Sequence, residues 1–157
     1  MIFRYSVSLY GVNLQPKNVI PKVKGDFILE DYFHPDDDII DYFQPGVNTG
    51  KKYGCGEMTY FHPMKVACDD WIKEYEEEIV EFVQMNNRLF WDNDVEKLCV
   101  FLEVFYDGGQ CNFSIFDQAK IKRLANCNIE FPISIYALDM DTYLNWEKET
   151  QTNWENR

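Results

Sequence analysis

The chain has 157 residues, of which 46% are hydrophobic and 17% aromatic; this composition is far from that of a disordered chain and suits one domain with its own core. Asp and Glu number 27 against 15 Lys and Arg, so the formal net charge is −12. Such a charge repels nucleic acid and anionic membranes and speeds encounter with cationic partners, so we expect neither a nucleic-acid nor a membrane partner.

The N-terminal segments predict a strand followed by a short helix. Residues 3–9 alternate apolar with polar side chains, which is typical of a half-buried strand and unlike a signal peptide. Pro16 suits the first turn of a short helix through Ile20, and Pro21 should stop that helix. We therefore expect folded structure from the first residues onward.

The next segment is acidic. The four charged residues up to Gly25 are all basic, whereas the seven between Asp26 and Gly50 are all acidic, so at least one strongly negative surface region is expected. Residues 26–33 predict an exposed or edge strand, because acids interrupt the apolar residues. The frequent Asp, Pro, Gly and Asn that follow predict mostly loop up to about Gly56.

The stretch DDWIKEYEEEIVEF, residues 69–82, predicts the longest helix, which should continue to about residue 90. At 100° per residue its apolar side chains fall within an arc of about 120°, which should face the core, and its acids lie on the opposite side. The apolar arc comprises Trp71, Ile72, Tyr75, Ile79, Phe82, Val83, Leu89 and Phe90, and the opposite side comprises Asp70, Glu74, Glu77 and Glu81.

The segment LCVFLEVFY, residues 98–106, is apolar on both faces of its pleat apart from Glu103. This pattern predicts a central strand. Residues 107–110, DGGQ, are typical of a hairpin turn, so residues 111–116 should return as the partner strand.

The rest of the chain predicts a helix, a strand and a variable end. Asp117 is expected to be the N-cap of a helix ending near Asn126. Ile121 and Leu124 should face the core. A last strand is expected over residues 128–138, at a sheet edge or with a bulge, because a proline lies inside it.

Together these elements predict a single α+β domain over residues 1–140, with a mostly antiparallel sheet and helices packed on one of its faces. Residues 141–157 are expected to form a C-terminal helix or a frayed tail. Five scattered cysteines without a CxxC pair fit reduced thiols in a cytoplasmic protein. The longest apolar run is too short to span a membrane.

Catalysis and metal binding find little support in the sequence. The acids of residues 69–82 lack a Glu-x-x-His pair and point away from the apolar arc, so no metal or other cofactor is expected. Cys55, between two glycines, and His62 are the best enzyme candidates and would make a small thiol enzyme. The acidic surroundings would raise the pKa of that thiol, and we expect no catalytic residues.

Two stretches resemble a bacterial family of unknown function. RYSVSLYGVNLQPKNVI is similar to its opening strand, glycine and short helix, and LCVFLEVFYDGGQCNFSIFDQAKIKRLANCNIEFPISIYAL is similar to its C-terminal half. Some members of that family resemble immunity proteins of polymorphic toxin and contact-dependent inhibition systems. Such proteins occupy a toxin's catalytic domain in the cytoplasm and perform no chemistry. Residues 26–63 lie outside the resemblance.

The resemblance and the charge lead to one hypothesis: a cytoplasmic immunity protein, not an enzyme, that neutralises a cognate toxin domain, with a basic nuclease as the expected toxin. The alternatives are a phage-type anti-defence or nucleic-acid-mimic protein and, as a third class, a thiol enzyme using Cys55. Carboxylates with aromatic anchors should form the binding surface. The expected partner-binding residues are Asp36, Asp37, Asp38, Asp41, Tyr42, Phe43, Asp70, Glu74, Glu77, Glu81 and Trp91.

Overall fold

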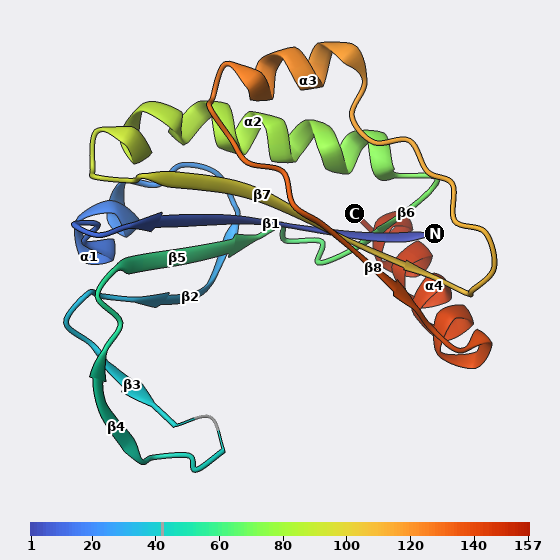
Figure 1. Ribbon diagram of the computed structural model, residues 1–157. Helices are drawn as coiled ribbons and strands as arrows, with labels where there is room; N and C mark the ends of the chain where they lie inside the picture. Colours follow the sequence, from blue (N-terminus) through green and yellow to red (C-terminus); the bar gives the residue numbers. More distant parts are fainter. Residues whose placement is uncertain (42) are drawn as a thin grey trace.

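Figure 1 shows the computed structural model, which describes residues 1–41 and 43–157. Over these residues the chain forms one α+β domain with a six-stranded, mostly antiparallel sheet, a separate two-stranded hairpin and four α-helices. The predicted fold class is therefore confirmed. None of the described helices is long and apolar enough to cross a bilayer.

The strands and helices alternate along the chain, and their order in the sheet differs from their order in the sequence. The strands are β1 (Ile2–Gly11), β2 (Ile28–Phe33), β3 (Asp38–Ile40), β4 (Asn48–Lys52), β5 (Gly56–Phe61), β6 (Ala67–Cys68), β7 (Lys97–Tyr106) and β8 (Ile133–Ala137). The helices are α1 (Pro16–Val19), α2 (Ile72–Trp91), α3 (Gln118–Ala125) and α4 (Met140–Glu155), with a 3-10 turn at Ile20–Lys22. The sheet order is β2-β5-β1-β7-β8, and β6 pairs with the start of β1.

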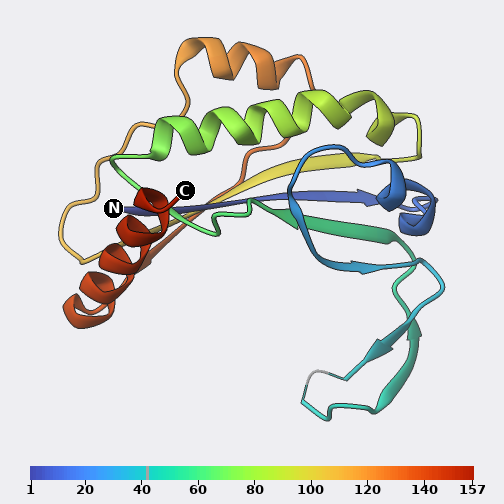
Figure 2. The same cartoon turned by 180° about the vertical axis from the view of Figure 1, so that it is seen from behind.

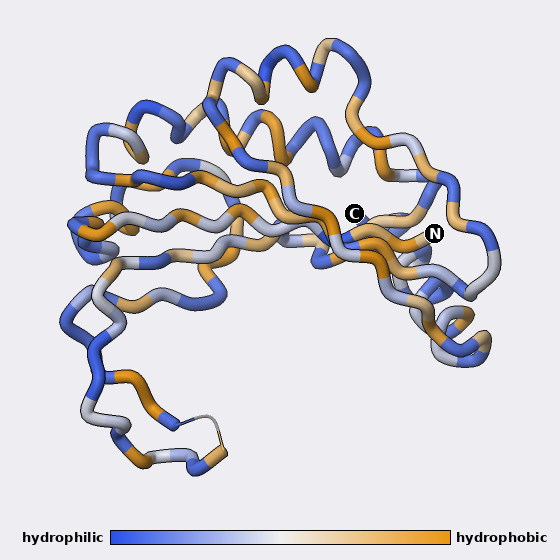
Figure 3. The backbone as a smooth tube through the Cα atoms, in the orientation of Figure 1, coloured by the Kyte–Doolittle hydropathy of each residue, from blue (hydrophilic) through white to orange (hydrophobic). Residues whose placement is uncertain are grey.

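α2 and α3 cover one face of the sheet, and the core lies between these helices and the strands (Figures 1 and 2). The predicted N-terminal strand is confirmed as β1, and its apolar side chains from Phe3 to Leu9 face α2, but Ser6 and Ser8 on its other face are buried too, so the strand is not half-buried. The Tyr5 ring lies 5.6 Å from the Tyr75 ring of α2. Hydrophobic residues recur along the strands and α2 in Figure 3, as expected for a sheet with one covered face.

Within residues 1–41 and 43–157, no helix lies across the centre of the opposite face of the sheet. The β3–β4 hairpin projects from one end of this side, and α4 lies at the other end (Figures 1 and 2). Tyr143 of α4 packs with Ile2 and Phe105 on this face. Near the C-terminus, Trp154 donates its indole N–H to the Val66 carbonyl at 2.8 Å. The C-terminal residues, expected as a helix or a frayed tail, are therefore a helix, α4, which crosses the end of the sheet.

The predicted loop up to Gly56 is only partly correct. It contains the β3–β4 hairpin, and β5 follows it with alternating buried and half-buried side chains. All five residues of β4 are exposed, so no hydrophobic pattern marks that strand in the sequence. Residues 26–33 do contain an edge strand, β2, as predicted.

The predicted hairpin after β7 is wrong. Residues 111–116 do not form a strand and instead run along the helix-covered side of the sheet. There the Phe113 ring lies 6.2 Å from Phe3 and the Phe116 ring lies 5.3 Å from Tyr5. The chain then returns through α3 to β8, which pairs parallel with β7. A parallel pair needs such a crossover, whereas a hairpin can join only antiparallel strands.

α3 begins as predicted, with Asp117 accepting a hydrogen bond from the Lys120 amide at 2.9 Å, and it ends at Ala125, with Asn126 as its C-cap, close to the predicted end. Leu124 is buried, but Ile121 is 54% exposed, so its predicted inward orientation is wrong. The reason is that Lys120 occupies the inward side of this turn, next to a buried acid of α2.

Candidate functional site

The β3–β4 hairpin forms an arm (residues 36–41 and 43–53) that stands away from the sheet (Figure 1). Its base is anchored to the domain by two contacts. The Phe33 and Tyr53 rings stack with centroids 3.7 Å apart, and the Gly54 amide donates to the Pro35 carbonyl at 2.9 Å. Because the base is fixed in this way, the arm projects from a defined point at the end of β2.

Apolar side chains on the arm are exposed. Phe43 is 89% exposed, and Ile40 and Val47 are about half exposed. Burying large apolar side chains is favourable, so a group of them on a projecting hairpin is typical of a surface that another protein covers.

The predicted acids of the arm have different local roles. Asp37 accepts from the His34 amide at 2.7 Å, and Asp41 accepts from the Phe43 amide at 2.8 Å. Asp38 pairs with Lys52 across the hairpin, and this hydrogen-bonded ammonium holds the pKa of the Asp38 carboxyl below its usual range. Asp36 is exposed beside them. Tyr42, also predicted to contact a partner, lies outside the described residues.

The predicted acids of α2 lie on the other side of the sheet from the arm (Figures 1 and 2). Glu74 and Glu81 are exposed on α2, and Asp70 is exposed in the turn that precedes the helix. Glu77 is half-buried and pairs with the Arg123 guanidinium of α3. The structure therefore does not bring the two predicted acidic groups into one patch, and the cations of α3 neutralise part of the α2 group.

Trp91, the third predicted aromatic anchor, is half-buried at the end of α2. Its indole N–H contacts the Asn87 side-chain oxygen at 2.9 Å and the Cys127 carbonyl at 3.3 Å. These contacts join α2 to the loop after α3, so the ring has a structural role whether or not it also meets a partner.

Cys55 and His62 lie at opposite ends of β5. A strand advances about 3.3 Å per residue, so the two side chains are about 20 Å apart and do not form a nucleophile–base pair. His62 is fully buried, donating from Nε2 to Glu78 at 2.6 Å while Nδ1 accepts from the Met64 amide at 2.9 Å. Burial lowers the pKa of His62, so the folded protein holds a neutral imidazole, even though Glu78 opposes this shift.

This lowered pKa predicts a pH-dependent stability. Below the ordinary histidine value of 6.5 the unfolded chain binds a proton that folded His62 does not, so the free energy of unfolding should fall as the pH is lowered from 7.5 to about 5.5. Urea titrations of the wild type and His62→Gln across this range would measure the loss. An unchanged slope in His62→Gln would contradict the assignment.

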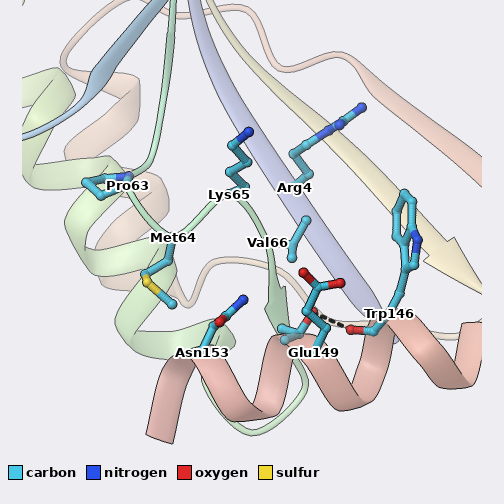
Figure 4. Close-up of a pocket in the computed structure, with 9 residues that line it drawn as sticks. Arg4, Pro63, Met64, Lys65, Val66, Trp146, Glu149 and Asn153 are labelled. Carbon is cyan, nitrogen blue, oxygen red and sulfur yellow. Dashed lines mark hydrogen bonds between the residues drawn. The ribbon is translucent and has the colours of Figure 1, made fainter. Parts of the chain in front are cut away.

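A cavity of about 510 Å³ lies between α4 and the segment before β6 (Figure 4). Arg4 on its wall is held by the Glu103 carboxylate, with Nη2 at 2.9 Å. The Thr150 hydroxyl donates to the Trp146 carbonyl at 2.7 Å. Its lining residues are Arg4, Pro63, Met64, Lys65, Val66, Trp146, Glu149, Thr150 and Asn153. In the described part of the chain, no three His, Cys, Asp or Glu side chains gather closely enough to hold a metal ion.

No family model, curated protein or solved structure matches this chain. The resemblance to immunity proteins therefore stays a prediction made from the sequence, and the geometry of the arm is the strongest guide to function.

Proposed function

We propose that this protein acts by binding another protein, in the manner of an immunity protein that neutralises a cognate toxin domain, and that the arm is its main contact. The observation that supports this proposal is the group of exposed apolar side chains on the arm, which includes Phe43 at 89% exposure. Aromatic side chains of this kind are common energetic centres of protein interfaces.

The charge of the arm suits a basic partner. Asp36, Asp37, Asp38 and Asp41 lie within six residues on the arm, and the whole chain has a net charge of −12. Carboxylates around an apolar contact accelerate encounter with a cationic surface and compete there with phosphate. A nuclease whose substrate groove is basic is therefore the expected toxin, and its inhibition requires no chemistry from this chain.

The arm is a better candidate for this contact than α2. One of the predicted α2 acids, Glu77, is already paired with Arg123. Beside the exposed α2 acids the one large exposed apolar side chain of this helix in the described residues is Met85, a turn after Glu81, whereas the arm carries several. A surface with charges alone steers a partner but adds little affinity.

The proposal predicts that the arm variants weaken binding and that matched variants elsewhere do not. With a toxin domain encoded next to this protein, Phe43→Ala should raise the Kd about 30-fold, a loss of about 2 kcal/mol. Asp36→Lys should slow association, and high salt should reduce the difference. The controls are Ile121→Ala, which truncates an exposed apolar side chain on α3, and Glu74→Lys, which reverses an exposed charge on α2. Calorimetry and stopped-flow binding would measure these effects.

Two results would count against the proposal. If the α2 and α3 variants weakened the affinity for the toxin domain as much as the arm variants did, the arm would not be the main contact. Inhibition of several unrelated DNA-binding proteins, instead of one toxin, would favour the alternative of a nucleic-acid mimic.

A further inference from the structure

The outer edge of β8 is open. β8 is the last strand of the sheet, and no other strand pairs with its outer side in the part of the chain that the structure describes. The segment from Phe131 to Leu138, FPISIYAL, contains no charged residue, although the chain has a net charge of −12. Ile133 and Ile135 on this strand are 44% and 52% exposed.

The backbone of β8 presents a regular set of donors and acceptors at this edge. The Glu130 amide donates to Leu98, and the Pro132 carbonyl accepts from Leu102, so the even-numbered residues face β7. By the two-residue period of a strand, the backbone groups of the odd-numbered residues from Ile133 to Ala137 face outward. A proline often protects a sheet edge because it has no N–H to donate. Just before β8 the position of this missing donor, Pro132, faces β7, so every outward-facing residue of β8 keeps its N–H.

The other edge of the sheet is protected. β2 contains Glu30 and Asp31 and an irregularity in its pairing with β5 between Leu29 and Asp31. Charges and bulges are the usual features that stop one sheet edge from pairing with another. β8 has neither of them, and its exposed apolar surface continues to Ile121 and to a groove of about 320 Å³ between α3 and Phe131.

We propose that β8 is a homodimerisation edge, at which a second copy of this chain pairs antiparallel and continues the sheet. A twofold axis at Ile135 places Ile135 opposite its counterpart and Ile133 opposite Ala137 of the second copy. All these residues have outward-facing backbone groups, so this register forms about six interchain hydrogen bonds. On the other face it places Ser134 opposite Tyr136.

Size and charge complementarity favour a second copy over another occupant. In this register a large side chain meets a small one at four of the five cross-strand positions, Ile135 meets its own counterpart at the fifth, and no like charges face each other within β8. The remaining charges of two −12 chains repel each other through solvent, so salt should strengthen the dimer. A five-residue strand is a small interface, and we expect a dimer at about 100 μM that dissociates near 1 μM.

Sedimentation equilibrium and hydrogen exchange on the whole chain test this proposal together. In about 0.5 M salt the apparent mass should rise toward that of a dimer as the protein concentration is increased. The amides of Ile133, Ile135 and Ala137 should become protected over the same range. The amides of Ser134 and Tyr136, which face β7, should be protected at every concentration.

Ile135→Lys should raise the dimer Kd about 100-fold, because it places two ammonium groups opposite each other. Ile28→Lys, the same change at an exposed position on β2, should have no effect. A monomer at all concentrations would overturn the proposal, as would a dimer in which the three outward amides stay unprotected or which Ile28→Lys also dissociates. Protection that appears only after a different protein is added would show that the edge accepts a partner's strand instead. The exchange measurement needs only the wild type, so it decides the matter even if Ile135→Lys fails to fold.

Discussion

Replacing Glu76 by alanine is expected to lower the free energy of unfolding by about 3–5 kcal/mol, because it removes a buried carboxylate on which three other groups depend. Glu76 is 3% exposed, on the side of α2 that meets α3. Its Oε1 accepts from the Phe116 amide at 2.7 Å and from the Tyr5 hydroxyl at 3.2 Å. Its Oε2 lies 4.0 Å from the Lys120 ammonium.

The cost comes from the groups that the substitution leaves behind. Burial raises the pKa of the Glu76 carboxyl, and the two hydrogen bonds and Lys120 offset that effect in part. Without the carboxylate, the Phe116 amide and the Tyr5 hydroxyl are buried without an acceptor, and the Lys120 side chain loses one of its two carboxylate neighbours. Each buried polar group without a partner costs about 1–3 kcal/mol.

Glu77→Ala is the matched control. Glu77 also joins α2 to a cation of α3, but both partners in its pair with Arg123 are about one-third exposed. Such a pair contributes about 0–1 kcal/mol. Urea unfolding followed by circular dichroism would give both values. Equal losses in the two variants would mean that Glu76 is no more than another surface ion pair.

Glu76 also shows why the helix was predictable from the sequence and its polar contacts were not. The spacing of apolar residues in DDWIKEYEEEIVEF correctly predicted α2 and the buried Tyr75, Ile79 and Phe90. Glu76 lies at the border of that apolar arc, and its partners Tyr5 and Phe116 are 71 and 40 residues away. No local period relates residues at such separations.

The topology after β7 could not be predicted for a similar reason. DGGQ suits a hairpin turn, and the residues after it alternate apolar and polar side chains, so local sequence favours a partner strand. In the fold, Phe113 and Phe116 contact β1 instead. Burying these aromatic rings over the sheet outweighs the local preference, and only knowledge of the neighbouring β1 would reveal it.

The arm was missed because its strands have no buried face. β3 and β4 are stabilised by each other and by their base, and their side chains are mostly exposed. Period-two alternation arises only when one face of a strand is buried. The acidic run at residues 36–41 marked the region as a surface, and Phe43 was expected there and is exposed, but the hairpin that carries it was not predicted.

Replacing Gly11 or Gly56 by alanine should also destabilise the protein strongly, by at least about 3 kcal/mol, because neither position has room for a methyl group. The two glycines are directly opposite each other where β1 pairs with β5. A Cβ on Gly11 would lie 2.0 Å from the Asp94 carbonyl oxygen, and one on Gly56 would lie 2.1 Å from the Leu14 carbonyl oxygen. Backbone oxygens cannot move aside as a flexible side chain could.

The crowding has a structural origin. The turn between α2 and β7 and the turn after β1 both pack against this end of the sheet, where the Glu96 amide donates to Tyr10 at 2.8 Å and the Leu14 amide donates to Gly11 at 3.2 Å. Leu14 itself is fully buried. An alanine at either glycine would have to separate these turns from the sheet and expose that leucine.

Gly54→Ala is the control for this effect. Gly54 lies two residues before Gly56 and has open space around its Cα, but its φ of 73° is a conformation that alanine adopts at a cost of about 1–2 kcal/mol. Thermal unfolding of the three variants should therefore give two large losses and one small loss. If Gly54→Ala were the most destabilised, backbone conformation and not close packing would be the dominant constraint on the glycines in this part of the chain. A small loss in Gly11→Ala and Gly56→Ala would mean that the two turns can move away from the sheet without unfolding it.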